Sequence, residues 1–249
     1  MQTAPSFDPR APGAATVPAP SRLVTDAPTR MFHWLFALSF VGAYLTAESE
    51  HWRLLHVTLG YSFAGLLVFR LLYGLLGPRQ AGLGLLWRKL GCAPAWLRSL
   101  KAGATVNWRQ GQHLAMALAI VLMLALVLPL TLSGYATYND WGDVLGGDWL
   151  EEAHELFGNA FLAVVLAHLG LIALLSVLRR QNLALPMLTG RLPGGGPSPV
   201  RHNRVWLAVA VLLAVLAFGA WQWQDSPRGL VPGLGTSSAL VQGGDHDDD

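Results

Sequence analysis

Five apolar stretches, separated by charged segments, limit what this chain can fold into. They cover residues 31–47, 54–76, 114–135, 153–178 and 205–223. Each approaches or reaches the roughly 17–25 residues with which an α-helix crosses about 30 Å of hydrocarbon. None shows the alternation of a barrel strand, so the backbone polar groups must be satisfied within helices. We therefore predict an all-α integral membrane protein with five transmembrane helices.

The composition supports this class. Only 13% of the residues are charged and 53% are hydrophobic, whereas about a quarter of a soluble domain is charged. The single cysteine, Cys92, rules out an intramolecular disulfide and a multi-cysteine metal site. The chain also lacks a CxxCH motif, so we expect no covalently attached c-type haem.

The charges alternate in sign from one connecting segment to the next. Arginine and lysine gather before the first stretch and in the segments 77–113 and 179–204. The acidic residues gather around 48–50 and 140–152 and at the C-terminus. Because basic loops stay on the cytoplasmic side, we predict a cytoplasmic N-terminus and a C-terminus on the outer side of the membrane.

These patterns divide the chain into five parts. Residues 1–29 read as a disordered cytoplasmic tail, 30–192 as the main bundle, 193–204 as a cytoplasmic linker, 205–223 as a fifth transmembrane helix and 224–249 as an acidic periplasmic tail. The first apolar run starts too late for a signal peptide, so we expect it to be retained. Residues 83–100 mix Leu and Trp with Arg and Lys, as in either an interfacial helix or an ordinary basic loop.

Six of the eight histidines lie in or beside the apolar stretches. An ionisable side chain in a membrane is costly, so it usually faces the bundle interior and marks function. Taken alone, any one of them near a helix end is explained equally well as a functional residue or as a hydrogen-bonded structural residue. The six are His33, His51, His56, His113, His154 and His168.

The spacing of two histidines changes this balance. His154 and His168 are fourteen residues apart in one predicted helix, which gives about 21 Å of rise and places both within roughly 40° of one face. One helix therefore offers a ligand at each of two depths. His56 begins its helix on the outer side, beside His154, and His33 begins its helix on the inner side, toward His168.

These four histidines predict two bis-histidine sites, each holding one haem b. A low-spin b haem takes two axial imidazoles and leaves no open position, which suits electron transfer. Zinc would need three or four ligands that converge on one point. The histidines instead divide between two levels, and no acidic residue lies near the middle of a stretch. We therefore favour haem over zinc.

Neighbouring residues are consistent with haem. Gly60 and Gly158 each follow an outer histidine by four residues, which leaves room for a flat porphyrin. Arg30 and Arg53 each precede a histidine by three residues, so both are candidates to pair with haem propionates. Arginines at helix ends also snorkel toward water, and this explanation remains open.

The inner pair has a mismatch in depth. His33 lies three residues from the arginine before it, whereas His168 lies eleven residues from the arginine that ends its stretch. Either the fourth helix extends beyond the bilayer or another histidine completes the inner site. The alternative ligands are His113 for the inner site and His51 for the outer site.

Three stretches of the chain resemble the bacterial cytochrome b561 family, which includes cytochrome b subunits of nickel-iron hydrogenases and formate dehydrogenases. They read VTDAPTRMFHWLFALSF, WRLLHVTLGYSFAGLLVFRLLYGLLGPR and HELFGNAFLAVVLAHLGLIALLSVLRRQNLALPMLTGR, within residues 23–192. The resemblance implies a four-helix haem-binding bundle with ligands on the first, second and fourth helices, at His33, His56, His154 and His168.

The chain departs from the family pattern in two places. Relatives often open the third helix with Gly-His-Asn-Pro, where this chain has Gly111, Gln112, His113 and Leu114. The fifth apolar stretch and the acidic tail lie outside the resemblance, so it implies no role for them.

From the predicted haems we expect an electron-transfer protein of the respiratory chain, embedded in membrane lipid. It would connect the quinone pool, ubiquinone or menaquinone, with a periplasmic c-type cytochrome or oxidoreductase, and we expect no nucleic-acid partner. Two alternatives remain open: a quinone reductase that oxidises a small outer donor such as superoxide, and a membrane anchor of a dehydrogenase. The outer acidic segments either dock a basic partner or only reflect topology and solubility.

Overall fold

The computed structural model describes residues 20–79, 81–101, 106–142 and 147–225, and this part is mostly helical. Its long helices are α1 (Ala27–Thr46), α2 (Arg53–Leu76), α5 (Trp108–Tyr138), α7 (Trp149–Arg179) and α9 (Val205–Asp225). They coincide with the five predicted stretches and begin or end a few residues further out. The acidic tail predicted for residues 224–249 lies outside the described residues after Asp225.

Four of these helices are long and apolar enough to cross a membrane. They are α2 together with the single turn η1 (Glu50–Trp52) before it, α5, α7 and α9. The predicted fifth, C-terminal span is thus among the candidates.

α1, the first predicted span, is not among them, although its 20 residues give it a length of about 30 Å. The polar side chains of Arg30, His33 and Trp34 lower its mean hydropathy. α1 packs along α2 and α9, so it belongs to the same bundle. That it crosses the membrane stays a prediction.

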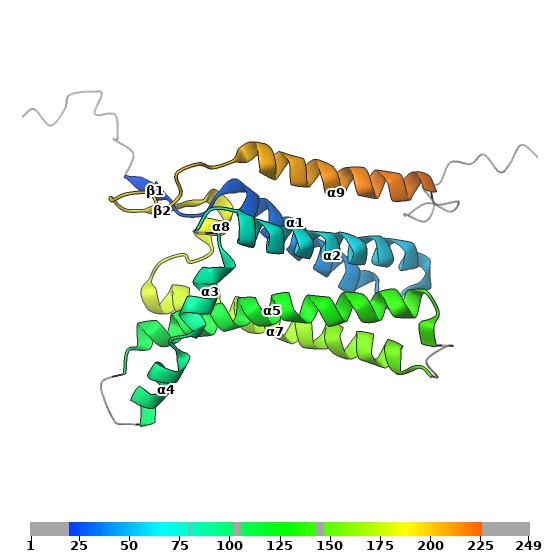
Figure 1. Cartoon of the computed structure of the whole chain (residues 1–249), viewed down its shortest axis with the longest axis horizontal. Helices are drawn as coiled ribbons and strands as arrows, with labels where there is room; N and C mark the ends of the chain where they lie inside the picture. The colour runs from blue at the N-terminus through cyan, green and yellow to red at the C-terminus, as the bar shows by residue number, and fades with distance from the viewer. Residues whose placement is uncertain (1–19, 80, 102–105, 143–146, 226–249) are drawn as a thin grey trace, which may run out of the picture.

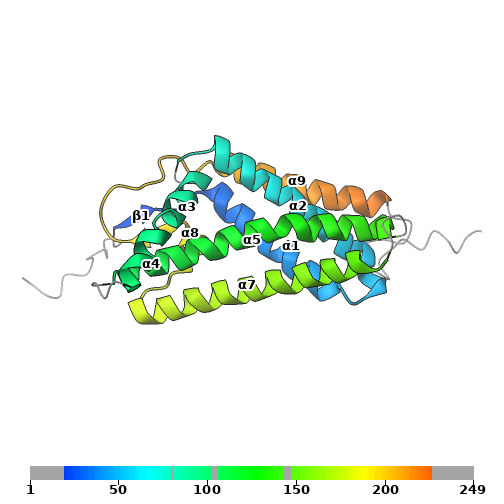
Figure 2. The ribbon, with the colours of Figure 1, turned by 60° about the horizontal axis from the view of Figure 1, so that its bottom comes forward.

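The bundle has two layers. In Figure 1, α1, α2 and α9 lie on one side and the antiparallel pair of α5 and α7 on the other; Figure 2 shows the same helices turned toward the α5–α7 side. α5 and α7 contact each other along most of their length, as do α1 and α2, and α2 also packs on α5.

Phenylalanine side chains fill the space between the layers. Phe161 of α7 is only 1% exposed, and its ring centroid lies 4.5 Å from that of Phe40 and 5.3 Å from that of Phe63. Phe36 stacks on Phe63 at 4.1 Å. We call Phe36, Phe40, Phe63 and Phe161 the phenylalanine cluster.

Short elements gather at one end of the bundle, which we call the basic end (Figure 1). They are α3 (Leu83–Leu90), α4 (Ala93–Lys101), α8 (Leu185–Thr189) and the antiparallel strands β1 (Ser21–Leu23) and β2 (Arg191–Pro193). Residues 83–100, for which an interfacial helix or a basic loop was left open, are mostly helical in α3 and α4, and their place at the membrane interface stays a prediction. Both helices end in basic residues and bury none of their side chains.

Part of the predicted disordered tail is ordered, and residues 1–19 of that tail lie outside the described residues. β1 falls within it, and α1 begins at Ala27 because Asp26 caps its N-terminus, accepting a hydrogen bond from the Thr29 amide at 3.2 Å. Asp26 is buried and also accepts a hydrogen bond from the Tyr73 hydroxyl. The Ala27 amide donates to Oδ1 of Asn203 at 2.9 Å, so the predicted linker is fastened to the start of α1.

We expect Phe161→Ala to lower the free energy of unfolding by about 3 kcal/mol, because it removes the centre of the phenylalanine cluster and leaves a cavity. Thermal unfolding of the purified protein in detergent measures this. Leu166→Ala on the exposed side of the same helix is the control, with an expected loss within about 0.5 kcal/mol. Equal losses for the two variants would show that the cluster does not hold the layers together.

Candidate functional site

The outer histidines face each other across the two layers. The imidazole centroids of His56 on α2 and His154 on α7 lie 5.9 Å apart, and the ring planes cross at 83°. Both side chains are half-buried. Two imidazoles bound to opposite sides of one metal, with metal–nitrogen bonds of about 2 Å, have their ring centres about 6 Å apart. The observed separation suits a shared axial pair.

Backbone carbonyls fix the tautomer of both outer histidines. His56 Nδ1 lies 2.8 Å from the carbonyl oxygen of Ala43, and His154 Nδ1 lies 3.0 Å from that of Leu130. A carbonyl only accepts, so each Nδ1 carries the proton and donates it. The lone pair of each imidazole is therefore on Nε2. A metal-binding histidine commonly has this arrangement, with one ring nitrogen free to bind and the other donating a hydrogen bond that orients the ring.

The partner of His56 is available for a structural reason. Ala43 lies in the last turn of α1, where carbonyl groups have no amide four residues ahead within the helix. The Ala47 amide bonds the Tyr44 carbonyl instead. The end of α1 thus orients a side chain at the start of α2.

Gly134 of α5 is a site residue that the sequence reasoning missed. A Cβ at this position would lie 2.7 Å from Cε1 and 2.9 Å from Nδ1 of His154. Only glycine leaves room for the imidazole there. The signal in the sequence was a glycine inside a long apolar helix. Glycine there lowers helix stability by about 1 kcal/mol relative to alanine, so its presence points to a close packing contact.

The two glycines singled out beside the outer histidines border open space. No atom lies within 4 Å of a Cβ built on Gly60, and only Leu130 Cδ1, at 3.9 Å, lies near one built on Gly158. Neither glycine therefore places an atom in the way of a flat ring beside the imidazoles. The outer residues therefore fit a haem.

The inner histidines lie on α1 and α7, two helices that meet at the phenylalanine cluster. His33 on α1 and His168 on α7 are both half-buried. The Nδ1 atoms of both are buried and have no hydrogen-bond partner among the described residues. The inner imidazoles therefore lack the hydrogen bonds that orient the outer pair.

The length of α7 accounts for the mismatch in depth. Both α5 and α7 have 31 residues, which corresponds to about 46 Å, well over the roughly 30 Å of hydrocarbon. In Figure 1 they extend beyond α1 and α2 at the basic end. Arg179 at the end of α7 donates to Gln112 of α5, so the extended ends remain paired. This length is consistent with a fourth helix that extends beyond the bilayer, and the pairing of His33 with His168 stays a prediction.

The two predicted propionate partners differ in their surroundings. Arg30 donates from Nη1 to the Leu188 carbonyl at 3.1 Å, while its buried Nε has no partner among the described residues. Arg53 is exposed, lies 3.7 Å from the Glu50 carboxylate and contacts the Tyr138 ring. Arg30 retains a buried donor for an anion, whereas Arg53 would have to exchange Glu50 for one.

The alternative ligands are placed less favourably. His51 in η1 and His113 near the start of α5 are both exposed, as is His202 in the linker. Within the part of the chain that the structure describes, no three His, Cys, Asp or Glu side chains converge as a metal site would require. The half-buried pairs suit a group with two axial ligands better than they suit zinc.

One comparison with known proteins identifies the family of the chain. The model of the family described as prokaryotic cytochrome b561 matches residues 24–190, which is most of the chain and includes both histidine pairs. No curated protein and no solved structure matches. The match ends before α9. The chain thus belongs to the prokaryotic cytochrome b561 family, whose members are multi-pass membrane proteins that use haem b to transfer electrons.

Proposed function

We propose that the protein binds two b haems, one at each histidine pair, and carries electrons across the bilayer between the quinone pool and a periplasmic redox protein. The observation that supports this most strongly is the outer pair, two imidazoles 5.9 Å apart with both Nδ1 atoms held by backbone carbonyls. Along α7, His154 and His168 are separated by about 21 Å, enough to place one site toward each side of the membrane.

Haem supplies the reversible one-electron chemistry, and the chain supplies position and surroundings. His56 and His154 would hold one haem, and His33 and His168 the other. The carbonyls of Ala43 and Leu130 orient the outer imidazoles. The phenylalanine cluster excludes water between the two levels, and burial of this kind helps to set a haem potential.

The charges support an orientation in the inner membrane. The arginines and lysines of α3, α4 and the linker lie at the basic end of the bundle. Basic segments remain in the cytoplasm, so this end would face the cytoplasm and the opposite end the periplasm.

The opposite end carries exposed acidic side chains that would attract a basic partner such as a c-type cytochrome. Superoxide, the small outer donor considered as an alternative, is an anion and would be repelled by the same field. The acidic end therefore favours a protein partner. The exposed acids are Glu48, Glu50, Asp140, Asp148, Glu151, Glu152 and Glu155.

Single histidine variants test the pairing. We expect His56→Ala and His154→Ala to lose the same haem, and His33→Ala and His168→Ala to lose the other, because each haem needs both of its axial ligands. Pyridine haemochrome content and low-temperature spectra of the purified variants measure this, with exposed His113→Ala as the control that keeps both. If one member of a pair keeps the haem that its partner loses, the pairing is wrong.

Gly134→Ala tests the proposed outer site without removing a ligand. The new methyl group would push the His154 imidazole out of line, because it would lie 2.7 Å from Cε1. We expect a several-fold drop in outer-haem occupancy or a shifted absorption band. Gly170→Ala on α7, where no atom lies within 4 Å of the new group, is the control. An unchanged Gly134→Ala spectrum would argue against haem ligation by His154.

Salt dependence tests the acidic surface. We expect the oxidation of the reduced haems by a basic cytochrome c to slow by about tenfold between low and physiological ionic strength, as for electrostatically steered encounters. Glu151→Gln with Glu152→Gln should reduce the rate at low salt, while Arg98→Gln at the basic end should not. Stopped-flow spectroscopy measures the rates. A rate independent of salt would contradict docking at this surface.

A further inference from the structure

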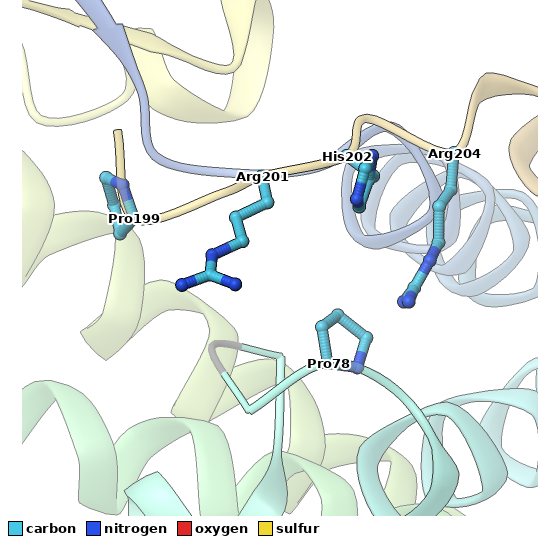
Figure 3. A pocket seen from close by; sticks show the side chains of 5 residues that line it. All are labelled: Pro78, Pro199, Arg201, His202 and Arg204. Atoms are coloured by element: carbon cyan, nitrogen blue, oxygen red, sulfur yellow. The ribbon is translucent and has the colours of Figure 1, made fainter. Parts of the chain in front are cut away.

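A cavity at the basic end is lined by none of the four predicted ligands. It has a volume of about 270 Å³ and lies between the turn after α2 and the segment that leads into α9. This is slightly below the roughly 300–1,000 Å³ of sites that enclose a whole drug-sized ligand, so it suits a head group. Its lining residues are Pro78, Pro199, Arg201, His202 and Arg204 (Figure 3).

The lining is cationic. In Figure 3 the guanidinium groups of Arg201 and Arg204 both extend from the linker toward the side of the cavity where Pro78 lies. None of the five lining residues has a carboxylate. Among the described residues the one ion pair is Arg53 with Glu50, so neither arginine has an acidic partner there. Two guanidinium groups without acids are suited to an anion with several oxygens.

Asp26 is the acidic group linked to this cavity, through Tyr73. It accepts a hydrogen bond from the Tyr73 hydroxyl, which also lies near Arg204. Asp26 is buried, accepts the Thr29 amide and the Tyr73 hydroxyl, and does not line the cavity. It therefore does not neutralise the cavity lining directly.

The backbone of Arg204 is strained. Its φ is 45°, in the left-handed region that favours glycine, and its carbonyl accepts the Leu207 amide at 3.0 Å in the first turn of α9. Strain of this kind gathers at functional sites, where the surrounding structure holds a side chain in place. The strained residue is one whose guanidinium group lines the cavity.

The cavity lies where two candidate spans end. Leu76, the last residue of α2, is 84% exposed, and Trp206, in the first turn of α9, is 71% exposed. Exposed apolar side chains at these positions face hydrocarbon in a membrane, so the adjacent arginines lie at head-group depth. Basic pockets between helices on the cytoplasmic side recognise anionic lipid head groups.

We propose that this cavity binds the phosphate group of an anionic phospholipid, such as phosphatidylglycerol or cardiolipin, with its acyl chains along α2 and α9. Arg201 and Arg204 bind the phosphate oxygens, and His202 donates a further hydrogen bond. α9 packs mainly on α1 and only slightly on α2. The lipid therefore links α9 to α2 at the basic end, independently of the haems.

Native mass spectrometry of the full, delipidated chain in detergent tests this with three probes: phosphatidylglycerol, phosphatidylcholine and inorganic phosphate. We expect one tightly held phosphatidylglycerol that neither of the other two displaces. Arg201→Gln with Arg204→Gln should weaken its binding by about tenfold, or about 1.4 kcal/mol. Arg88→Gln with Arg98→Gln, which removes the same charge from α3 and α4, should retain it.

Each of the following results would overturn the proposal. Equal losses of lipid affinity in both double variants would mean diffuse attraction to a basic surface. Equal binding of phosphatidylcholine would mean that the site does not select for the negative charge of the lipid. Displacement by inorganic phosphate would mean that the site binds a free anion. Haem absorbance checks the folding of each variant. Arg204 lies near Tyr73, so Arg204→Gln could prevent folding. In that case Arg201→Gln alone should still weaken phosphatidylglycerol binding several-fold. An unchanged affinity of Arg201→Gln would overturn the proposal.

Discussion

The packing of Phe161 against phenylalanines of α1 and α2 sets the relation between the two helical layers, and both candidate sites depend on it. Phe161 is seven residues from His154 and seven from His168, so it lies on nearly the same face of α7, about 10 Å from each. Its ring meets those of Phe40 and Phe63 at 4.5 and 5.3 Å. Large side chains at mid-depth keep the layers apart, and this spacing leaves room for the histidine side chains on either side of the cluster instead of direct contact between backbones.

The two levels differ in how far they are prepared for a ligand. At the outer level, Ala43 and Leu130 already hold the imidazoles of His56 and His154, so little side-chain freedom remains to be lost when a group binds there. At the inner level, the Nδ1 atoms of His33 and His168 lack partners among the described residues. The outer imidazoles are therefore oriented by the fold itself, whereas the described residues leave the inner imidazoles without such a hydrogen bond.

The features that the sequence predicts are those that depend on one helix at a time. The fourteen-residue spacing of His154 and His168 is local to α7, and apolar length and loop charge define the helices without reference to their neighbours. Gly134 and the carbonyl of Ala43 act across helices, so their roles depend on the register between α5 and α7 and between α1 and α2. Apolar length, charge and residue spacing do not reveal that register. The strand β1 was missed for a similar reason, because it forms only by pairing with β2, far along the chain.

The charge that orients the bundle also shapes its surfaces. The family match ends at residue 190, so α9 is attached to the electron-transfer core through a basic linker. That linker is fastened at Asn203 to the start of α1 and is strained at Arg204, while α9 itself has little contact with α2. A helix that packs mainly on one neighbour is held more firmly when another group joins it to a second neighbour. Arginines gather at this junction because basic segments stay on the cytoplasmic side, and they are suited to bind an anionic group from the membrane.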